Sequence, residues 1–287
     1  PRSRFRFTGY LRSMRRQENW PHAKSARALP PDHKGPPVMT PIPEDFVNAG
    51  IASVGPVAPV RRFQVLGERS SGTNFVKRLL GRNTALVPTE ALGWKHTCAA
   101  PPAVPRDLAV ICVVRAPEPW ALSMYDKPWH TTPDMQRLAF AEFIRHPWET
   151  IVDRSRYFDL PETSLGQPLH ADRDPVTGVP HPNLFALRRA KLNGLLDFLN
   201  RNCTCILLRL EIAQADPERA LNMIRQRLEL PSGEATFRPV VKRLGARFKA
   251  SVELRPVRPD AFSEGDRGFM WSQLDTATEA ALGYLAR

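Results

Sequence analysis

A continuous apolar run, Leu108–Val114, is the feature that most constrains the fold of this chain. A strand without polar alternation must be covered on both faces, which is typical of parallel sheets flanked by helices. A second short apolar run, residues 62–67, ends in glycine, and residues 73–80 then carry apolar side chains at helical spacing. We therefore predict an α/β fold, a central parallel sheet with helices on both faces in three layers.

The rest of the chain continues the alternation of strands and helices. Further strands are expected at 93–97 and 205–210, and further helices after Pro117, near 135–145, at 184–199, after Asp216, and at 271–285. The segment 126–182 is rich in Pro, His, Trp and Asp, and it is predicted to be an insertion that shapes a substrate pocket.

The amino-terminal segment has a different composition. Residues 1–60 contain ten prolines, and residues 1–40 hold nine Lys or Arg against two acids, which is +7 of the net charge of +12. We predict an extended basic arm, with a short helix near 9–18, followed by one domain over 61–287. The arm is either a solvated tail or a contact for an acidic polymer or an anionic membrane surface; nucleic acid is not the expected partner.

Hydropathy and cysteine content bear on the compartment. No apolar run approaches the roughly 20 residues of a membrane span, and four cysteines are too few for a disulfide framework. We expect a cytoplasmic protein, or a Golgi lumenal one if an anchor preceded Pro1. Cys203 and Cys205 have the spacing of a metal-binding fragment, but no second pair lies near them; buried strand residues are expected, as for Cys112, and no metal site.

The glycine loop predicts an anion site. Gly67 and Gly72 have the G-x-x-x-x-G spacing of a phosphate-binding P-loop and lie between a strand and a helix, where backbone N–H groups converge. The lysine and the hydroxyl residue that should follow are replaced by Thr73 and Asn74. ATP or GTP hydrolysis is therefore disfavoured, and a P-loop-NTPase-like sandwich that holds one phosphate or phosphosulfate is expected, with Thr73 and Arg69 as contacts.

Two motifs carry a resemblance to a known family. The loop Arg69-Ser-Ser-Gly-Thr-Asn74 resembles the phosphosulfate-binding loop of the sulfotransferase superfamily, and residues 113–125 resemble its 3′-phosphate motif, with Arg115 and then Ser123 eight positions later. The resemblance implies that the chain binds 3′-phosphoadenosine 5′-phosphosulfate (PAPS), releases the bisphosphate PAP and needs no metal. The implied binding residues are Arg69, Ser70, Ser71, Gly72, Thr73, Asn74, Arg115 and Ser123.

The same resemblance suggests catalytic residues. Gly93-Trp-Lys-His-Thr97 resembles the family's strand that delivers a histidine base, so His96 is the candidate base, with Glu68, Glu90 or Asp126 as alternatives. Ser70 stands where many members have the Lys or Arg that stabilises the bridging oxygen. That role either passes to Arg69, which is the expected residue, or to Lys77 or Lys95, or it is absent.

The carboxy-terminal part departs from the family pattern. Leu210 occupies the place of a frequent tyrosine, and no clear match exists for the last nucleotide-binding loop. Lys242, Arg243, Arg247 and Lys249 are candidates for that loop on charge alone.

The predicted function is transfer of a sulfuryl group to a hydroxyl or amine of a glycan, lipid or small molecule. A P-loop kinase or NTPase and a non-catalytic module that binds acidic polymers are the alternatives. The acceptor and the oligomeric state are left open.

Overall fold

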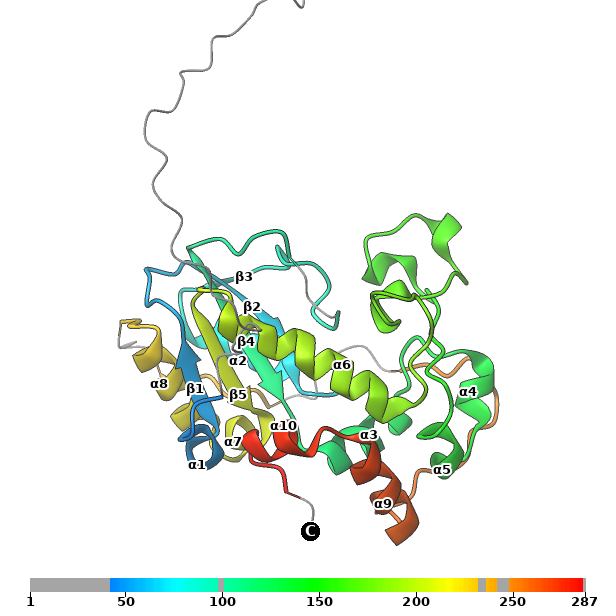
Figure 1. Cartoon of the computed structure of the whole chain (residues 1–287). Coiled ribbons are helices and arrows are strands. Elements are labelled where there is room, and N and C mark those ends of the chain that lie inside the picture. The colour runs from blue at the N-terminus through cyan, green and yellow to red at the C-terminus, as the bar shows by residue number, and fades with distance from the viewer. Residues whose placement is uncertain (1–41, 98–100, 232–235, 242–247, 286–287) are drawn as a thin grey trace, which may run out of the picture. The chain divides into compact units, whose positions relative to one another are not determined.

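A five-stranded sheet organises the part of the chain that the computed structural model describes, residues 42–97, 101–231, 236–241 and 248–285 (Figure 1). Its strands are β1 (Ile51–Val54), β2 (Arg62–Leu66), β3 (Val87–Pro88), β4 (Leu108–Val114) and β5 (Cys205–Arg209). They lie in the order β1-β5-β4-β2-β3, and the pairs β5–β4, β4–β2 and β2–β3 are parallel. The predicted parallel α/β sheet is confirmed, with β1 added antiparallel at one edge.

The central strand β4 is buried along its whole length. Its side chains alternate between two hydrophobic clusters. Leu108 and Val110 pack in the cluster that includes Leu195 of the helix α6, and Ala109 and Ile111 pack in the cluster that includes Val76 of the helix α2. The helices therefore cover both faces of the sheet, and Figure 1 shows α6 in front of it and α2 behind it.

The helices bury the apolar faces that the sequence indicates. They are α1 (Phe46–Ala49), α2 (Thr73–Asn83), α3 (Pro117–Asp126), α4 (Pro133–Arg137), α5 (Phe140–Phe143), α6 (Leu184–Leu196), α7 (Leu210–Ala215), α8 (Pro217–Arg227), α9 (Glu264–Gln273) and α10 (Thr276–Ala281). The predicted start of α8 is confirmed, because the Asp216 side chain accepts a hydrogen bond from the backbone N–H of Arg219. Among the described residues, no helix has the length and apolarity to span a membrane.

The strand predicted at 93–97 is wrong. The strand that follows α2 is β3, a few residues earlier in the chain, and residues 93–97 form turns. Gly93 has φ of 85°, which breaks an extended conformation, and its carbonyl accepts a hydrogen bond from the Gln64 side chain instead of from a ladder. The Lys95 carbonyl accepts from the backbone N–H of Gly67, so the turn is attached to the glycine loop.

Two predicted helices are interrupted. The helix expected near 135–145 is divided into α4 and α5, because Leu138 and Ala139 are extended and the Glu142 carboxylate accepts from the Ala139 N–H at the start of α5. The helix expected at 271–285 is divided into α9 and α10. There Leu274 is extended, and the Asp275 side chain caps α10 by accepting from the N–H groups of Ala277 and Thr278.

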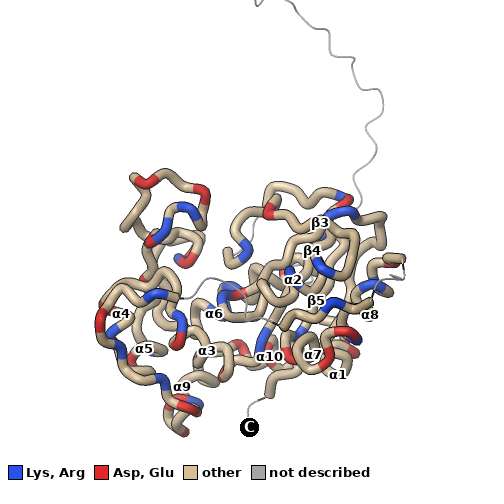
Figure 2. The backbone as a smooth tube through the Cα atoms, turned by 180° about the vertical axis from the view of Figure 1, so that it is seen from behind, with Lys and Arg blue, Asp and Glu red and all other residues tan. Residues whose placement is uncertain are grey.

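The domain begins earlier than residue 61. Within the segment expected to be an arm, α1 and β1 are ordered elements, and Ile51 pairs with Leu208 in the sheet. The helix expected at 9–18 lies outside the described residues. Over the described backbone, positions with Lys or Arg are intermixed with positions with Asp or Glu (Figure 2).

Two of the cysteine expectations are confirmed: Cys112 and Cys205 are buried strand residues. Cys203 is also buried, but it lies in the loop before β5, so the strand expected for it is wrong.

The segment 126–182 holds little regular structure. Besides α4 and α5 it contains the single turns Ser155–Tyr157, Glu162–Ser164 and His170–Asp172. It extends away from the sheet on the side of α4 and α5 (Figure 1). Its aromatic side chains nonetheless contact the glycine-loop side of the sheet, where the ring of Phe158 lies 5.0 Å from that of Trp94.

Candidate active site

The glycine loop lies where the chain direction across the sheet reverses. From β2 the chain passes to β3 on one side, and then returns to β4 on the other side. The loop follows the carboxyl end of β2, and Arg115 follows that of β4. Ligands of open parallel sheets bind in the crevice outside the strand ends at such a switch point.

The loop backbone is shaped to present N–H groups. Ser70 and Gly72 adopt left-handed conformations, with φ of 64° and 86°, and the Ser71 hydroxyl donates to the Glu68 carbonyl at 2.7 Å. Gly72 is the N-cap of α2 and supplies no side-chain cap to the first turn of this helix. Free N–H groups and the positive end of the helix dipole therefore point to one place, which suits an anion.

A substitution at Gly72 is expected to disrupt this loop. A Cβ atom there would lie 2.3 Å from Cδ1 of Leu210, on a backbone with positive φ. Left-handed strain and overpacking together cost about 2–5 kcal/mol, so Gly72→Ala should lower the free energy of unfolding by that amount in urea denaturation. Gly81→Ala in the same helix is the control, since its Cβ would meet no atom within 4 Å. Equal effects of the two variants would contradict the steric role of Gly72.

Arg115 and Ser123 lie beside the loop. The Arg115 guanidinium donates from Nη1 to the Ser70 carbonyl at 2.8 Å, so it is held against the glycine loop. Ser123 is on α3, the helix that begins after Arg115. Both residues line a cavity of about 630 Å³ together with Ser70, Gly72, Thr73 and Asn74.

A buried ion network centred on Arg188 contacts the glycine loop. Arg188 of α6 is fully buried and bonds Glu68 at 2.7 Å and Glu279 of α10 at 2.6 Å. Its Nη2 also donates to the Arg115 carbonyl at 2.9 Å. Burial raises the pKa of Glu68 to about 8, although Arg188 opposes this rise. The network ties the glycine loop and the end of β4 to α6 and α10.

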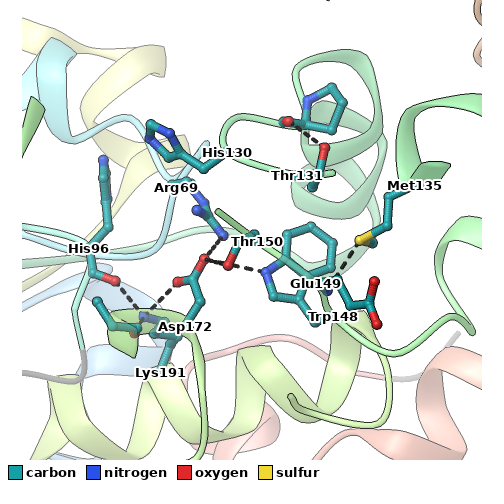
Figure 3. Close-up of polar contacts among 12 residues, drawn as sticks. Arg69, His96, His130, Thr131, Met135, Trp148, Glu149, Thr150, Asp172 and Lys191 are labelled. Atoms are coloured by element: carbon teal, nitrogen blue, oxygen red, sulfur yellow. Dashed lines mark hydrogen bonds and ion pairs between the residues drawn. The ribbon is translucent and has the colours of Figure 1, made fainter. Parts of the chain in front are cut away.

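A second ion network holds Arg69 (Figure 3). Asp172, from the insertion, lies 2.6 Å from Nη2 of Arg69 and 3.0 Å from Nζ of Lys191. Burial would raise the pKa of Asp172, but the charges of Arg69 and Lys191 hold it below its ordinary value, so Asp172 is ionised. The hydroxyl of Thr150 donates to the same carboxylate at 3.1 Å. The Arg69 guanidinium is therefore fixed in direction.

A larger cavity adjoins the first. It has a volume of about 770 Å³, and its walls combine the turn 93–97 with the aromatic residues Trp129, Tyr157 and Phe158. The residues that line both cavities are Arg69, Asn74, His96, Lys127 and Trp129. Two ligand-sized spaces thus share one wall next to the glycine loop.

His96 and Lys95 lie in this shared region. His96 Nδ1 lies 2.7 Å from the Gly67 carbonyl, which accepts only, so Nδ1 carries the proton and Nε2 has the lone pair of the neutral ring. Burial, and then the charge of Lys95, lower the pKa of His96 well below its ordinary value, so the ring is neutral at pH 7. Lys95 donates to Asn74 at 2.5 Å and lines the larger cavity only.

The other base candidates are placed differently. Glu68 is buried in the Arg188 network and Asp126 is at the end of α3, and neither lines one of the two cavities. Glu90 lines the larger cavity and pairs with Lys77 at 2.5 Å. Lys77 itself lines neither cavity, whereas Arg69 lines both.

The expected carboxy-terminal contacts are mostly outside the described residues. Lys242, Arg243 and Arg247 lie outside the described residues. Lys249 is described; it is exposed and lines neither cavity. In the smaller cavity the wall is formed instead by Leu210 and Val241.

Sequence reasoning missed Arg188, Asp172 and His130. Arg188 lies within an amphipathic helix, where a charged residue is usually solvated, and nothing in the pattern marks its burial. The composition of 126–182, with its Trp and His residues, indicated a pocket wall but not which residue faces it.

Comparisons with family models, with curated proteins and with solved structures return no match to this chain. Among the described residues, no group of three or more His, Cys, Asp or Glu side chains is arranged to hold a metal ion.

Proposed function

We propose that this chain is a sulfotransferase with a P-loop-like fold, which moves the sulfuryl group of PAPS to a hydroxyl or amine acceptor. One observation carries the proposal: two cavities meet at the glycine loop, and the smaller one is lined by that loop and by Arg115 and Ser123. PAPS has phosphate groups at both ends of its adenosine, so a nucleotide cavity with two separate anion sites suits it.

Each part of the site has a role in this proposal. The loop from Ser70 to Asn74 holds the 5′-phosphosulfate through its N–H groups and the Thr73 hydroxyl. Arg115 and Ser123 hold the 3′-phosphate. Arg69, fixed by Asp172, stabilises the charge that develops on the leaving phosphate, and Lys95 assists from the acceptor side. His96 is the base candidate that the sequence indicates.

The larger cavity is the proposed acceptor site. Its aromatic walls and its cations, Lys95, Lys127 and Arg156, suit an organic acceptor with ring faces and polar groups, such as a glycan, a lipid headgroup or a phenol.

A nucleoside triphosphate suits the loop less well. A triphosphate presents its phosphates as one chain and requires a lysine where Thr73 stands, whereas here Lys95 is bonded to Asn74 and lines the larger cavity only. A phosphotransferase is therefore the second candidate. A module that binds acidic polymers through the arm would leave both cavities without a role.

A thermal-shift comparison tests the nucleotide. At about 100-fold excess over Kd, PAP should stabilise the chain by about 2.7 kcal/mol, and hence raise Tm by roughly 5–10 °C, while Mg·ATP at the same concentration should shift Tm much less. Stabilisation by Mg·ATP and not by PAP would favour the phosphotransferase. If neither nucleotide shifts Tm, and if deleting residues 1–41 abolishes retention on heparin resin, the polymer-binding module is favoured.

A further inference from the structure

A histidine–carboxylate pair lies in the wall of the larger cavity, outside the predicted site residues. Nδ1 of His130 lies 2.6 Å from Oδ1 of Asp153, and His130 lines this cavity although it is only 5% exposed. A carboxylate oxygen accepts hydrogen bonds, so Nδ1 carries the proton and Nε2 has the lone pair of the neutral ring. Within the described part of the chain, the bond to Asp153 is the one hydrogen bond of this ring, so Nε2 is not bonded to a protein group.

The position of the His130 ring is strongly fixed. Its backbone is left-handed, with φ of 68°, an arrangement that costs energy for a residue with a side chain. The backbone N–H of Ile151 donates to the His130 carbonyl at 2.8 Å, and the rings of Phe158 and Trp94 lie 4.9 Å and 5.9 Å from the imidazole. Strained residues that the fold holds in place are concentrated at functional sites.

The surroundings of His130 suit proton uptake better than those of His96. An imidazole that accepts a proton becomes a cation, which a carboxylate at Nδ1 stabilises and nearby cations destabilise. His96 has a carbonyl at Nδ1, and Lys95, Arg69 and Lys191 around it.

The charges around His130 are more favourable. Asp153 bonds its ring, and the charges of Arg69 and Asp172 act on it in opposite directions. Burial lowers the pKa of His130 and the Asp153 hydrogen bond opposes this, so the ring is neutral at pH 7 and has a partner that stabilises its charged form.

We infer that His130, oriented by Asp153, takes the proton from the acceptor hydroxyl. The inference rests on the proposed sulfuryl transfer. The acceptor oxygen forms a bond to sulfur, the bond between sulfur and the bridging oxygen breaks, and its electron pair leaves on the 5′-phosphate of PAP. The hydroxyl proton passes to Nε2 of His130 and then to solvent. In this scheme His96 has a structural role: its hydrogen bond to the Gly67 carbonyl holds the turn 93–97 against the glycine loop, in the wall that the two cavities share.

The kinetic test uses His130→Asn in the full chain. Asparagine adopts positive φ more readily than most residues, so the fold should be retained. With radiolabelled PAPS and an aliphatic alcohol or water as acceptor, whose hydroxyl is protonated at neutral pH, kcat should fall about 100-fold or more, while the affinity for PAP stays unchanged. The matched control is His170→Asn at an exposed histidine that lines neither cavity, and it should be as active as the wild type. The inference would be overturned if His130→Asn were fully active. It would also be overturned if kcat fell about 100-fold in His96→Asn but not in His130→Asn.

A second measurement needs no acceptor. Nitrogen-15 NMR of labelled imidazoles should show neutral His130 protonated at Nδ1, and Asp153→Asn should lower the pKa of His130 measurably. A proton on Nε2, or an unchanged pKa in Asp153→Asn, would overturn the inference independently of turnover. Failure of the wild type to bind PAP would instead count against the proposed function, and the NMR result would still decide the His130–Asp153 pairing.

Discussion

Arg115→Ala is expected to abolish most of the binding of PAP while leaving the fold intact. The guanidinium lies in the smaller cavity, at the end of β4, where it can form charge-assisted hydrogen bonds with a phosphate. Removing one partner of such a pair costs on the order of 3 kcal/mol, so Kd for PAP should rise about 100-fold in calorimetry. The thermal stabilisation by PAP should disappear at the concentration that saturates the wild type.

Two further variants separate the phosphate contact from support of the loop. Arg115 also donates to the Ser70 carbonyl, so its removal affects the glycine loop itself. Arg115→Lys keeps the charge but loses the planar fork, and should lie between the wild type and the alanine variant. Ser123→Ala removes one neutral donor from the same cavity and should raise the Kd for PAP by about 5-fold, which corresponds to about 1 kcal/mol. Binding of adenosine 5′-phosphosulfate, which lacks the 3′-phosphate, should change little in Ser123→Ala; an equal loss would contradict the assignment.

Arg188→Met is expected to be the most destabilising of these changes. Arg188 is fully buried and its side chain bonds two carboxylates, Glu68 and Glu279. Without it Glu279 keeps its charge in a buried site with no counter-charge, and Glu68 loses its hydrogen-bond donor; breaking a buried pair in this way typically costs about 3–5 kcal/mol. Chemical denaturation at pH 7 should show this loss.

Neutralising the carboxylates should restore the stability. The triple variant Glu68→Leu, Arg188→Met, Glu279→Leu contains no buried charge or unpaired polar side chain at this place, and replacement of a buried ion network by well-packed apolar residues is often neutral or stabilising. Glu68→Gln alone has a separate signature. Because the pKa of Glu68 is raised to about 8 from an ordinary 4.5, its contribution to stability is complete below about pH 4.5 and is lost as the pH rises towards 8. The variant should lack this decrease; an unchanged decrease would contradict the raised pKa.

The parts of the fold that follow from local pattern were predictable. The buried strand β4 was evident because seven consecutive apolar residues suit only a strand covered on both faces. The helix α8 was evident from Asp216 and Pro217, which set a helix start without any distant contact. The turn at 93–97 was not, because its hydrogen bonds go to the Gln64 side chain and to Gly67, residues that are distant in sequence.

The candidate site divides in the same way. The sequence by itself determined the glycine loop, because its spacing and its place between a strand and a helix depend on neighbouring residues. Arg115 and Ser123 were indicated by the resemblance of residues 113–125 to a phosphate-binding motif. Only the tertiary structure decided what surrounds them. Asp172 meets Arg69, and Arg188 meets Glu68, across separations of more than 100 residues, and His130 meets Asp153 within an insertion without regular periodicity. Such contacts depend on how the chain packs, and burial then fixes the charge state of each group.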